Sequence, residues 1–198
     1  MGFEVWDVVD IPAYPNQENS NLTTTRPAII IEDLQDEVEL CCLTKQLQQA
    51  SNYKYCFVVK RDSPEGKQMG LTFDSLAVID RTVTLAKFRL SQQIGSCPQN
   101  IIEKIEALIN QKREDEAEKF IEQNLNNPEL RRKAIDKALK EKQFKKAISF
   151  VRDGISLDLK EKPGLAMEWY DWLLRIALVQ KETPKIIEYA RFLFVGGA

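Results

Sequence analysis

The chain has 198 residues, enough for one large domain or two small ones, and 43% of them are hydrophobic, as is ordinary for a folded protein. It has no apolar run long enough to cross a bilayer and no basic, apolar leader, so we expect a cytoplasmic protein with no membrane partner. Histidine is absent, which excludes imidazole as a general acid, a general base or a metal ligand.

Charge is distributed unevenly along the chain. Residues 1–110 contain 10 Lys and Arg against 15 Asp and Glu, a net charge of −5. Residues 111–198 contain 18 against 15, a net charge of +3. An acidic first half is a poor electrostatic footprint for nucleic acid, so its charge counts against nucleic-acid binding by this half.

The four cysteines form no Cys-x-x-Cys pair. Without histidine, a zinc site would need an unusual set of ligands. We therefore expect the cysteines to be small core residues in a reducing compartment, and we expect neither a metal nor another cofactor.

The first half of the chain has the pattern of short strands. Alternating or β-branched apolar residues predict strands at residues 3–9, 27–31, 37–43, 53–59 and 76–79. Polar segments at residues 16–21 and 62–66 are typical of turns, and residues 45–51 fit a short helix. Five or six short strands with such turns predict a compact SH3-like β-barrel.

After Gly95 the apolar residues follow a helical period, and near Asn110 the composition changes to Lys, Glu and Ala. Residues 138–152 match residues 177–191 at an offset of 39, which indicates stacked helical hairpins loosely similar to tetratricopeptide repeats. We therefore predict an α+β chain of two domains: a barrel over residues 1–110 and an all-α helical-hairpin repeat domain over residues 111–198.

A basic stretch, residues 131–146, has two interpretations. It could supply phosphate contacts that offset the acidic barrel, or it could be the solvated face of repeat helices. In the following helix Trp169 and Trp172 are three residues apart and share a face, which predicts burial between hairpins, with a peptide-binding groove as the alternative.

An ordered set of motifs in residues 1–110 resembles the MazF/PemK family. The matching segments are VWDV at 5–8, RPAII at 26–30, LTKQ at 43–46, GLTFDS at 70–75 and DRTVTLAKFRL at 80–90. Residues 16–25 resemble the mobile loop that covers the RNA site in that family. The resemblance implies a homodimeric endoribonuclease toxin of a type II toxin–antitoxin system, inhibited by an antitoxin protein.

The resemblance also implies a chemistry and its residues. Single-stranded RNA is cleaved without a metal, by attack of the ribose 2′-hydroxyl on the adjacent phosphate. The implied catalytic residues are Arg26, which stabilises the phosphorane charge, and Thr44, which donates a hydrogen bond to a phosphate oxygen. The implied RNA-binding residues are Asn19, Asn21, Thr24, Thr25, Lys45 and Gln46.

Departures from the family pattern keep a second hypothesis open. Val83 and Ala86 stand where the family usually has arginine and often has aspartate. A catalytically silent barrel that serves as a binding or regulatory module, with the helical repeats as its partner surface, fits these changes and the acidic charge. Under that hypothesis Arg26 holds a loop through a carboxylate such as Asp33 or Asp36, and Thr44 caps the helix at residues 45–51.

Overall fold

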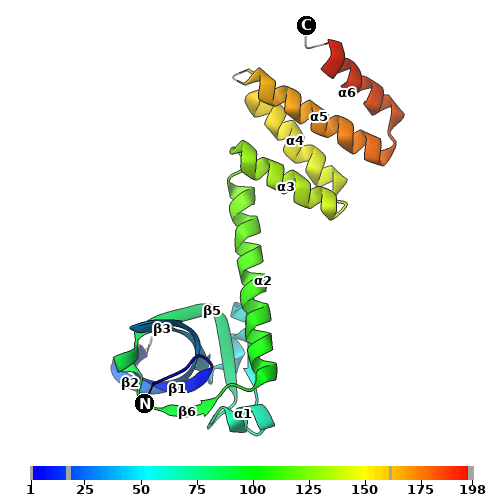
Figure 1. Ribbon diagram of the computed structural model, residues 1–198. Helices are drawn as coiled ribbons and strands as arrows, with labels where there is room; N and C mark the ends of the chain where they lie inside the picture. Colours follow the sequence, from blue (N-terminus) through cyan, green and yellow to red (C-terminus); the bar gives the residue numbers. More distant parts are fainter. Residues whose placement is uncertain (1, 17–18, 161, 196–198) are drawn as a thin grey trace. The chain divides into compact units, whose positions relative to one another are not determined.

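The computed structural model describes residues 2–16, 19–160 and 162–195, with the backbone alone at 12–16, 19–24 and 195 (Figure 1). The strands are β1 (Asp7–Asn16), β2 (Asn19–Leu34), β3 (Glu37–Thr44), β4 (Cys56–Val59), β5 (Ser75–Ala86) and β6 (Gln93–Ser96). The α-helices are α1 (Pro64–Gln68), α2 (Gln99–Gln123), α3 (Pro128–Lys140), α4 (Phe144–Asp158), α5 (Pro163–Gln180) and α6 (Thr183–Val195). Two 3₁₀ turns are η1 (Leu47–Asn52) and η2 (Lys87–Arg89).

The chain divides into two compact units, Met1–Arg113 and Glu114–Ala198. Helix α2 runs through Asn110 without a break, so the composition change expected to mark a boundary falls inside a helix. In the described part of the chain, no helix combines the length and the apolar character that a membrane span requires.

The first unit is a six-stranded antiparallel sheet in the order β4-β5-β3-β2-β1-β6. Its strands curl into a half-barrel (Figure 1). The predicted α+β fold class is therefore confirmed: a curled antiparallel sheet, here a half-barrel, is followed by helices.

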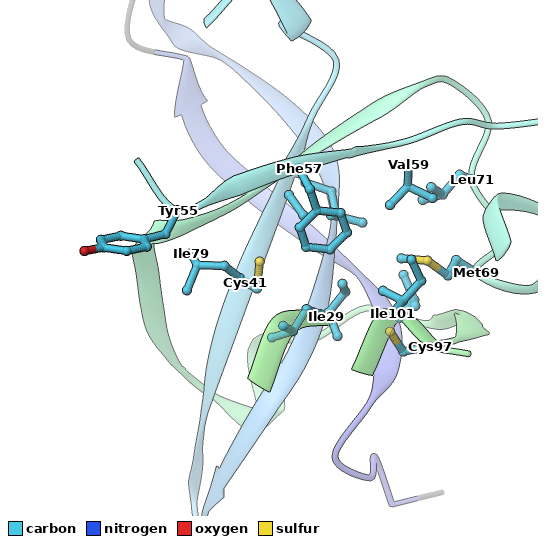
Figure 2. Close-up of a cluster of buried hydrophobic side chains, with 14 residues drawn as sticks. Ile29, Cys41, Tyr55, Phe57, Val59, Met69, Leu71, Ile79, Cys97 and Ile101 are labelled. Carbon is cyan, nitrogen blue, oxygen red and sulfur yellow. The ribbon is translucent and has the colours of Figure 1, made fainter. Parts of the chain in front are cut away.

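The curled sheet buries both of its faces because successive side chains alternate between them. Ile29 belongs to one core cluster, whereas its neighbours Ala28 and Ile30 belong to the other. Figure 2 shows the first cluster, in which side chains of several strands meet Ile101 of α2. Ile105, one turn further along α2, is also fully buried in this cluster, so the start of α2 covers this face of the sheet.

Three expectations about local structure are wrong. The first strand begins at Asp7 rather than at residue 3, since Trp6 sits in a turn with a φ of 76°. Residues 19–25 belong to β2 and not to a loop, and the β-branched run of three threonines at 23–25 favours that extended backbone; residues 17 and 18 lie outside the described chain. The turn expected at 62–66 contains α1, which the Ser63 hydroxyl caps by accepting from the Gly66 N–H at 3.1 Å.

The helices of the second unit pack in chain order, α3 on α4, α4 on α5 and α5 on α6. Helix α3 begins at Pro128, and the side chain of its N-cap residue Asn127 accepts from the Glu129 N–H at 2.9 Å. The 39-residue offset is also visible in the backbone. Lys142 and Lys181 both adopt a left-handed φ, 58° and 57°. After each of them the next residue's N–H bonds back to a carbonyl five residues earlier, at 2.8 and 3.0 Å.

A buried polar network ties α3, α4 and α5 together. Arg131 Nη1 donates to Asp158 Oδ2 at 3.1 Å, and Trp169 Nε1 donates to the same oxygen at 2.8 Å. The Arg131 guanidinium lies 5.1 Å from the centroid of the Trp169 ring. All three residues are buried, and Gly154 allows the approach, since a Cβ there would lie 3.0 Å from both Arg131 and Trp169. The expected burial of Trp169 is confirmed.

Replacing Asp158 with alanine tests this network. Asp158→Ala leaves the Arg131 charge buried without its carboxylate, so we expect the helical unit to lose about 3–5 kcal/mol of its free energy of unfolding. Urea denaturation followed by circular dichroism at 222 nm measures the change. Asp153→Ala, at an exposed aspartate of the same helix, is the control and should change stability by less than about 0.5 kcal/mol. Equal effects of the two variants would contradict the role of the network.

A second ion pair, at the edge of this network, joins α3 to α5. Arg132 donates to both oxygens of Glu168, from Nε at 2.6 Å and from Nη2 at 2.8 Å. This hydrogen bonding holds the pKa of Glu168 below its usual value, against the opposing effect of desolvation. A carboxylate whose pKa is lower in the folded state stabilises the fold above its unfolded pKa and loses that contribution in acid.

The pH dependence of stability tests this pair. Glu168→Gln should lower the free energy of unfolding at pH 7, by roughly 0.2–1 kcal/mol because both partners are partly exposed. The difference between variant and wild type should shrink as the pH falls below about 4.5, the usual glutamate pKa, because the carboxylate of the unfolded chain takes up its proton there while that of the folded chain does so only at lower pH. Glu116→Gln, at an exposed position, provides the control. A difference that stays constant down to pH 2 would show that charge pairing is not its cause.

Candidate active site

Arg26 and Thr44 stand opposite each other at one end of the β2–β3 ladder. The ladder pairs Ala28 with Cys42 in antiparallel register. Arg26 is two residues before Ala28, and Thr44 is two residues after Cys42, so continuing the register places them on adjacent strands and on the same face. The backbone pairing therefore brings together two residues that are 18 positions apart in the sequence.

The two side chains line one pocket of about 140 Å³. Its lining residues are Thr25, Arg26, Leu43, Thr44, Lys45, Gln46 and Phe73. Among the described residues, the lining has two cations, two hydroxyls, an amide and an aromatic ring, and no carboxylate or thiol. Pockets for whole drug-sized ligands are usually about 300–1,000 Å³, so this one fits a single group such as a phosphate.

The Thr44 hydroxyl is oriented by the chain that follows it. Its Oγ1 accepts the backbone N–H of Gln46 at 3.2 Å. This bond occupies an oxygen lone pair and leaves the hydroxyl hydrogen available to an acceptor in the pocket. The expected helix over residues 45–51 is the 3₁₀ turn η1, which begins at Leu47, and its N-cap residue Gln46 makes no side-chain capping bond. Thr44 thus fixes the turn before η1 and keeps a donor to offer.

The positive charge of Arg26 acts on the neighbouring thiol of Cys42. Burial raises the pKa of the Cys42 thiol, and the positive charge of Arg26 acts in the opposite direction. Two carboxylates, Asp33 and Asp36, are the expected partners of Arg26 if it only holds a loop. Asp36 lies beyond β2 in the turn before β3. Asp33 binds Lys87, whose Nζ is 2.7 Å from Oδ1. Seven residues of extended strand separate Arg26 from Asp33, roughly 20 Å, so this pair is out of reach.

The predicted RNA-binding residues fall into two groups, according to whether the structure describes their side chains. Thr25, Lys45 and Gln46 line the pocket with Arg26. The backbone of Asn19, Asn21 and Thr24 lies in β2, but their side chains lie outside the described part of the structure.

Phe73 is the pocket residue that sequence reasoning missed. It lies in the GLTFDS motif just before β5, in a position where the family resemblance assigns no role. Gly70 of the same motif has a φ of 68°, and a Cβ there would lie 2.0 Å from the carbonyl oxygen of Ile94. The signal available in the sequence was an aromatic residue between the glycine and the serine of one motif.

Four of the eight cations in the basic stretch of the helical unit are engaged within that unit, and the other four are exposed. Arg131 is buried, and Arg132 binds Glu168. Lys137 and Lys146 pair with glutamates of α2, at 2.7 Å to Glu118 and 2.7 Å to Glu122 respectively. These four cations serve packing between helices, which favours the solvated-face interpretation over phosphate binding.

A larger hollow of about 620 Å³ lies on α5 and α6. Aromatic and aliphatic side chains dominate its lining, with Tyr170 stacked on Phe192 at 3.8 Å between ring centroids. Its charged lining residues, within the described chain, are Glu188 and Arg191. The smaller pocket is the better candidate for chemistry, because its polar groups converge.

Comparison with known proteins places the first unit in a family. The family model described as "PemK-like, MazF-like toxin of type II toxin-antitoxin system" matches residues 4–112. Among solved structures, the Mycobacterium tuberculosis toxin MazF-mt6 is 16% identical, covering 53% of this chain and 93% of its own, with a TM-score of 0.39. The MazE–MazF complex of Deinococcus radiodurans is 14% identical, covering 55% and 92%, with a TM-score of 0.41. No curated protein matches the chain. The family model spans more than half of the sequence, and the chain belongs to the PemK-like, MazF-like toxin family of type II toxin–antitoxin systems.

Proposed function

We propose that this toxin is an endoribonuclease that cleaves single-stranded RNA without a metal, and that Arg26 and Thr44 carry the reaction. The observation that carries the proposal is the pocket that both residues line, at one end of the β2–β3 ladder. Membership of a toxin family supports it. So does the described lining, which supplies cations and a hydroxyl for a phosphate but no carboxylate to hold a cation.

The chemistry follows from what the pocket offers. The ribose 2′-hydroxyl attacks the adjacent phosphorus, the bond to the 5′-oxygen of the next nucleotide breaks, and the products are a 2′,3′-cyclic phosphate and a free 5′-hydroxyl. Negative charge grows on the non-bridging oxygens in the transition state. The Arg26 guanidinium presents a planar fork of donors that fits two such oxygens, and the Thr44 hydroxyl donates to one of them.

Proton transfer is the weak part of such a site. Imidazole is the side chain best suited to accept a proton near pH 7, and this chain has none. The 2′-hydroxyl proton leaves to solvent, and the departing 5′-oxygen takes a proton from solvent. Catalysis comes mainly from electrostatic stabilisation and from positioning of the phosphate. Such a reaction should be slow and should accelerate as the pH rises.

The partners belong to the same proposal. The description of the family supports an antitoxin partner, and in this proposal the antitoxin blocks the pocket. The barrel acts as a cytoplasmic homodimer. The helical repeats of residues 111–198 form a separate adaptor or regulatory domain, which is supported by polar networks that are internal to them and engage half of the cations in their basic stretch.

Removal of the guanidinium tests the main assignment. In EDTA, the purified chain should cut a long, weakly structured RNA at discrete sites, and Arg26→Ala should lower kcat/KM at least about 10³-fold. Arg26→Lys should recover only part of this loss, since an ammonium keeps the charge but not the fork. Arg113→Ala, at an exposed arginine of α2, is the control and should cleave normally. Intact RNA with the folded wild-type protein would instead favour the silent binding module.

The hydroxyl of Thr44 can be tested with a nearly isosteric change. Thr44→Val removes the donor and keeps the shape, so we expect kcat to fall about 10²–10³-fold. Thr44→Ser restores the hydroxyl and should recover most of the activity. Thermal unfolding of both variants checks that the turn before η1 survives the loss of the bond to the Gln46 N–H. If the valine and serine variants lost activity equally, the hydroxyl would not be the contributing group.

A further inference from the structure

We propose that Phe73 is a positioning and specificity residue that stacks on a nucleobase next to the scissile phosphate. The inference rests on the proposed RNA substrate and deepens it. It identifies the feature of the substrate that the pocket would recognise besides its charge: the flat face of one unpaired base.

The topology brings Phe73 to the phosphate site from a third chain segment. Thr44, at the end of β3, pairs with Leu76 of β5. Because the strands are antiparallel, the residues after Thr44 run past the residues before Leu76. Phe73 therefore lies beside Lys45 and Gln46 and lines the same pocket as Arg26. A phosphate held by Arg26 would have its own nucleoside within reach of this ring.

Two hydrogen-bonded anchors fix the backbone around Phe73. The fully buried Ser75 donates from Oγ to the Phe73 carbonyl oxygen at 3.1 Å. On the adjacent residue, Asp74 accepts from the Arg61 N–H at 2.9 Å and from Lys60 Nζ at 2.9 Å. Both bonds lower the pKa of Asp74 below its usual value, and the bond from the Arg61 N–H has the larger effect. Asp74 therefore stays ionised at neutral pH. The ring is thus presented by a rigid segment.

Packing alone does not account for the ring. The neighbouring apolar residues Leu71 and Leu76 are buried in the barrel, whereas Phe73 is only half buried and keeps part of its surface in the pocket. Aromatic side chains that are exposed beside cations are the usual platform for unpaired bases, because every base has a face that can stack. A rigid ring beside Arg26 and Lys45 has this arrangement.

The test compares substitutions that keep or remove the aromatic face. Phe73→Leu keeps an apolar side chain and removes the ring, whereas Phe73→Tyr keeps the ring. For RNA cleavage in EDTA, we expect the leucine variant to raise KM about tenfold with little change in kcat, and the tyrosine variant to stay close to wild type. Phe120→Leu, at an exposed phenylalanine of α2, is the matched control.

A second readout does not depend on cleavage. Short single-stranded DNA has no 2′-hydroxyl and cannot be cut by the proposed chemistry. When such DNA carries 2-aminopurine, stacking on an aromatic ring quenches its fluorescence. Wild type and Phe73→Tyr should quench the probe, and Phe73→Leu should lose most of the quenching while circular dichroism confirms its fold.

The outcomes separate this inference from the proposed function. If the wild type cleaves RNA, and Phe73→Leu keeps the wild-type KM and the wild-type quenching, the inference is overturned and the nuclease proposal stands. Quenching that depends on Phe73 in a wild-type protein that cleaves no RNA supports the stacking site and overturns the nuclease. If the wild-type protein neither cleaves RNA nor quenches the probe, both the inference and the proposed function are overturned.

Discussion

The register between β2 and β3 is the constraint on which the candidate site depends. It sets Ala28 opposite Cys42, and continuing this register by two residues places Arg26 opposite Thr44. A slip of one residue would exchange the two faces of the strand and turn Arg26 away from Thr44. The same slip would exchange Ile29 with Ala28 and Ile30 between the two core clusters, so burial on both faces opposes it. The apolar core of the sheet therefore fixes the register that places Arg26 beside Thr44 in the polar pocket.

Charge in this chain is arranged locally rather than globally. The first 110 residues carry a net −5, yet the described pocket lining holds Arg26 and Lys45 and no acid. In the helical unit the reverse holds: net charge is positive, but Arg131, Arg132 and Lys137 are engaged with carboxylates of their own unit. Net charge by segment thus gives a poor guide to where an anion would bind, and the pairing of individual cations gives a better one.

The sequence predicted what local pattern controls. The alternation in residues 37–43 gave β3 within one residue. It failed where distant segments decide the structure. β5 continues past residue 79 to Ala86 because β3 is there to pair with it, although residues 80–86 alternate weakly. The presence of Phe73 in the pocket likewise depends on the pairing of Thr44 with Leu76, which no local window contains. The resemblance to a known family supplied Arg26 and Thr44, but it could not supply a residue that the family pattern leaves variable.

The two left-handed lysines of the helical unit have a consequence for its dynamics. Lys142 and Lys181 end α3 and α5 in a conformation that glycine adopts freely and that costs a residue with a Cβ about 1–2 kcal/mol. Packing of the flanking helices holds both turns in place, so each turn stores strain that is released when its helix end opens. Local opening releases that strain without unfolding the rest of the unit. Amide hydrogens around these two turns should therefore exchange with solvent earlier than those in the middle of the helices they join.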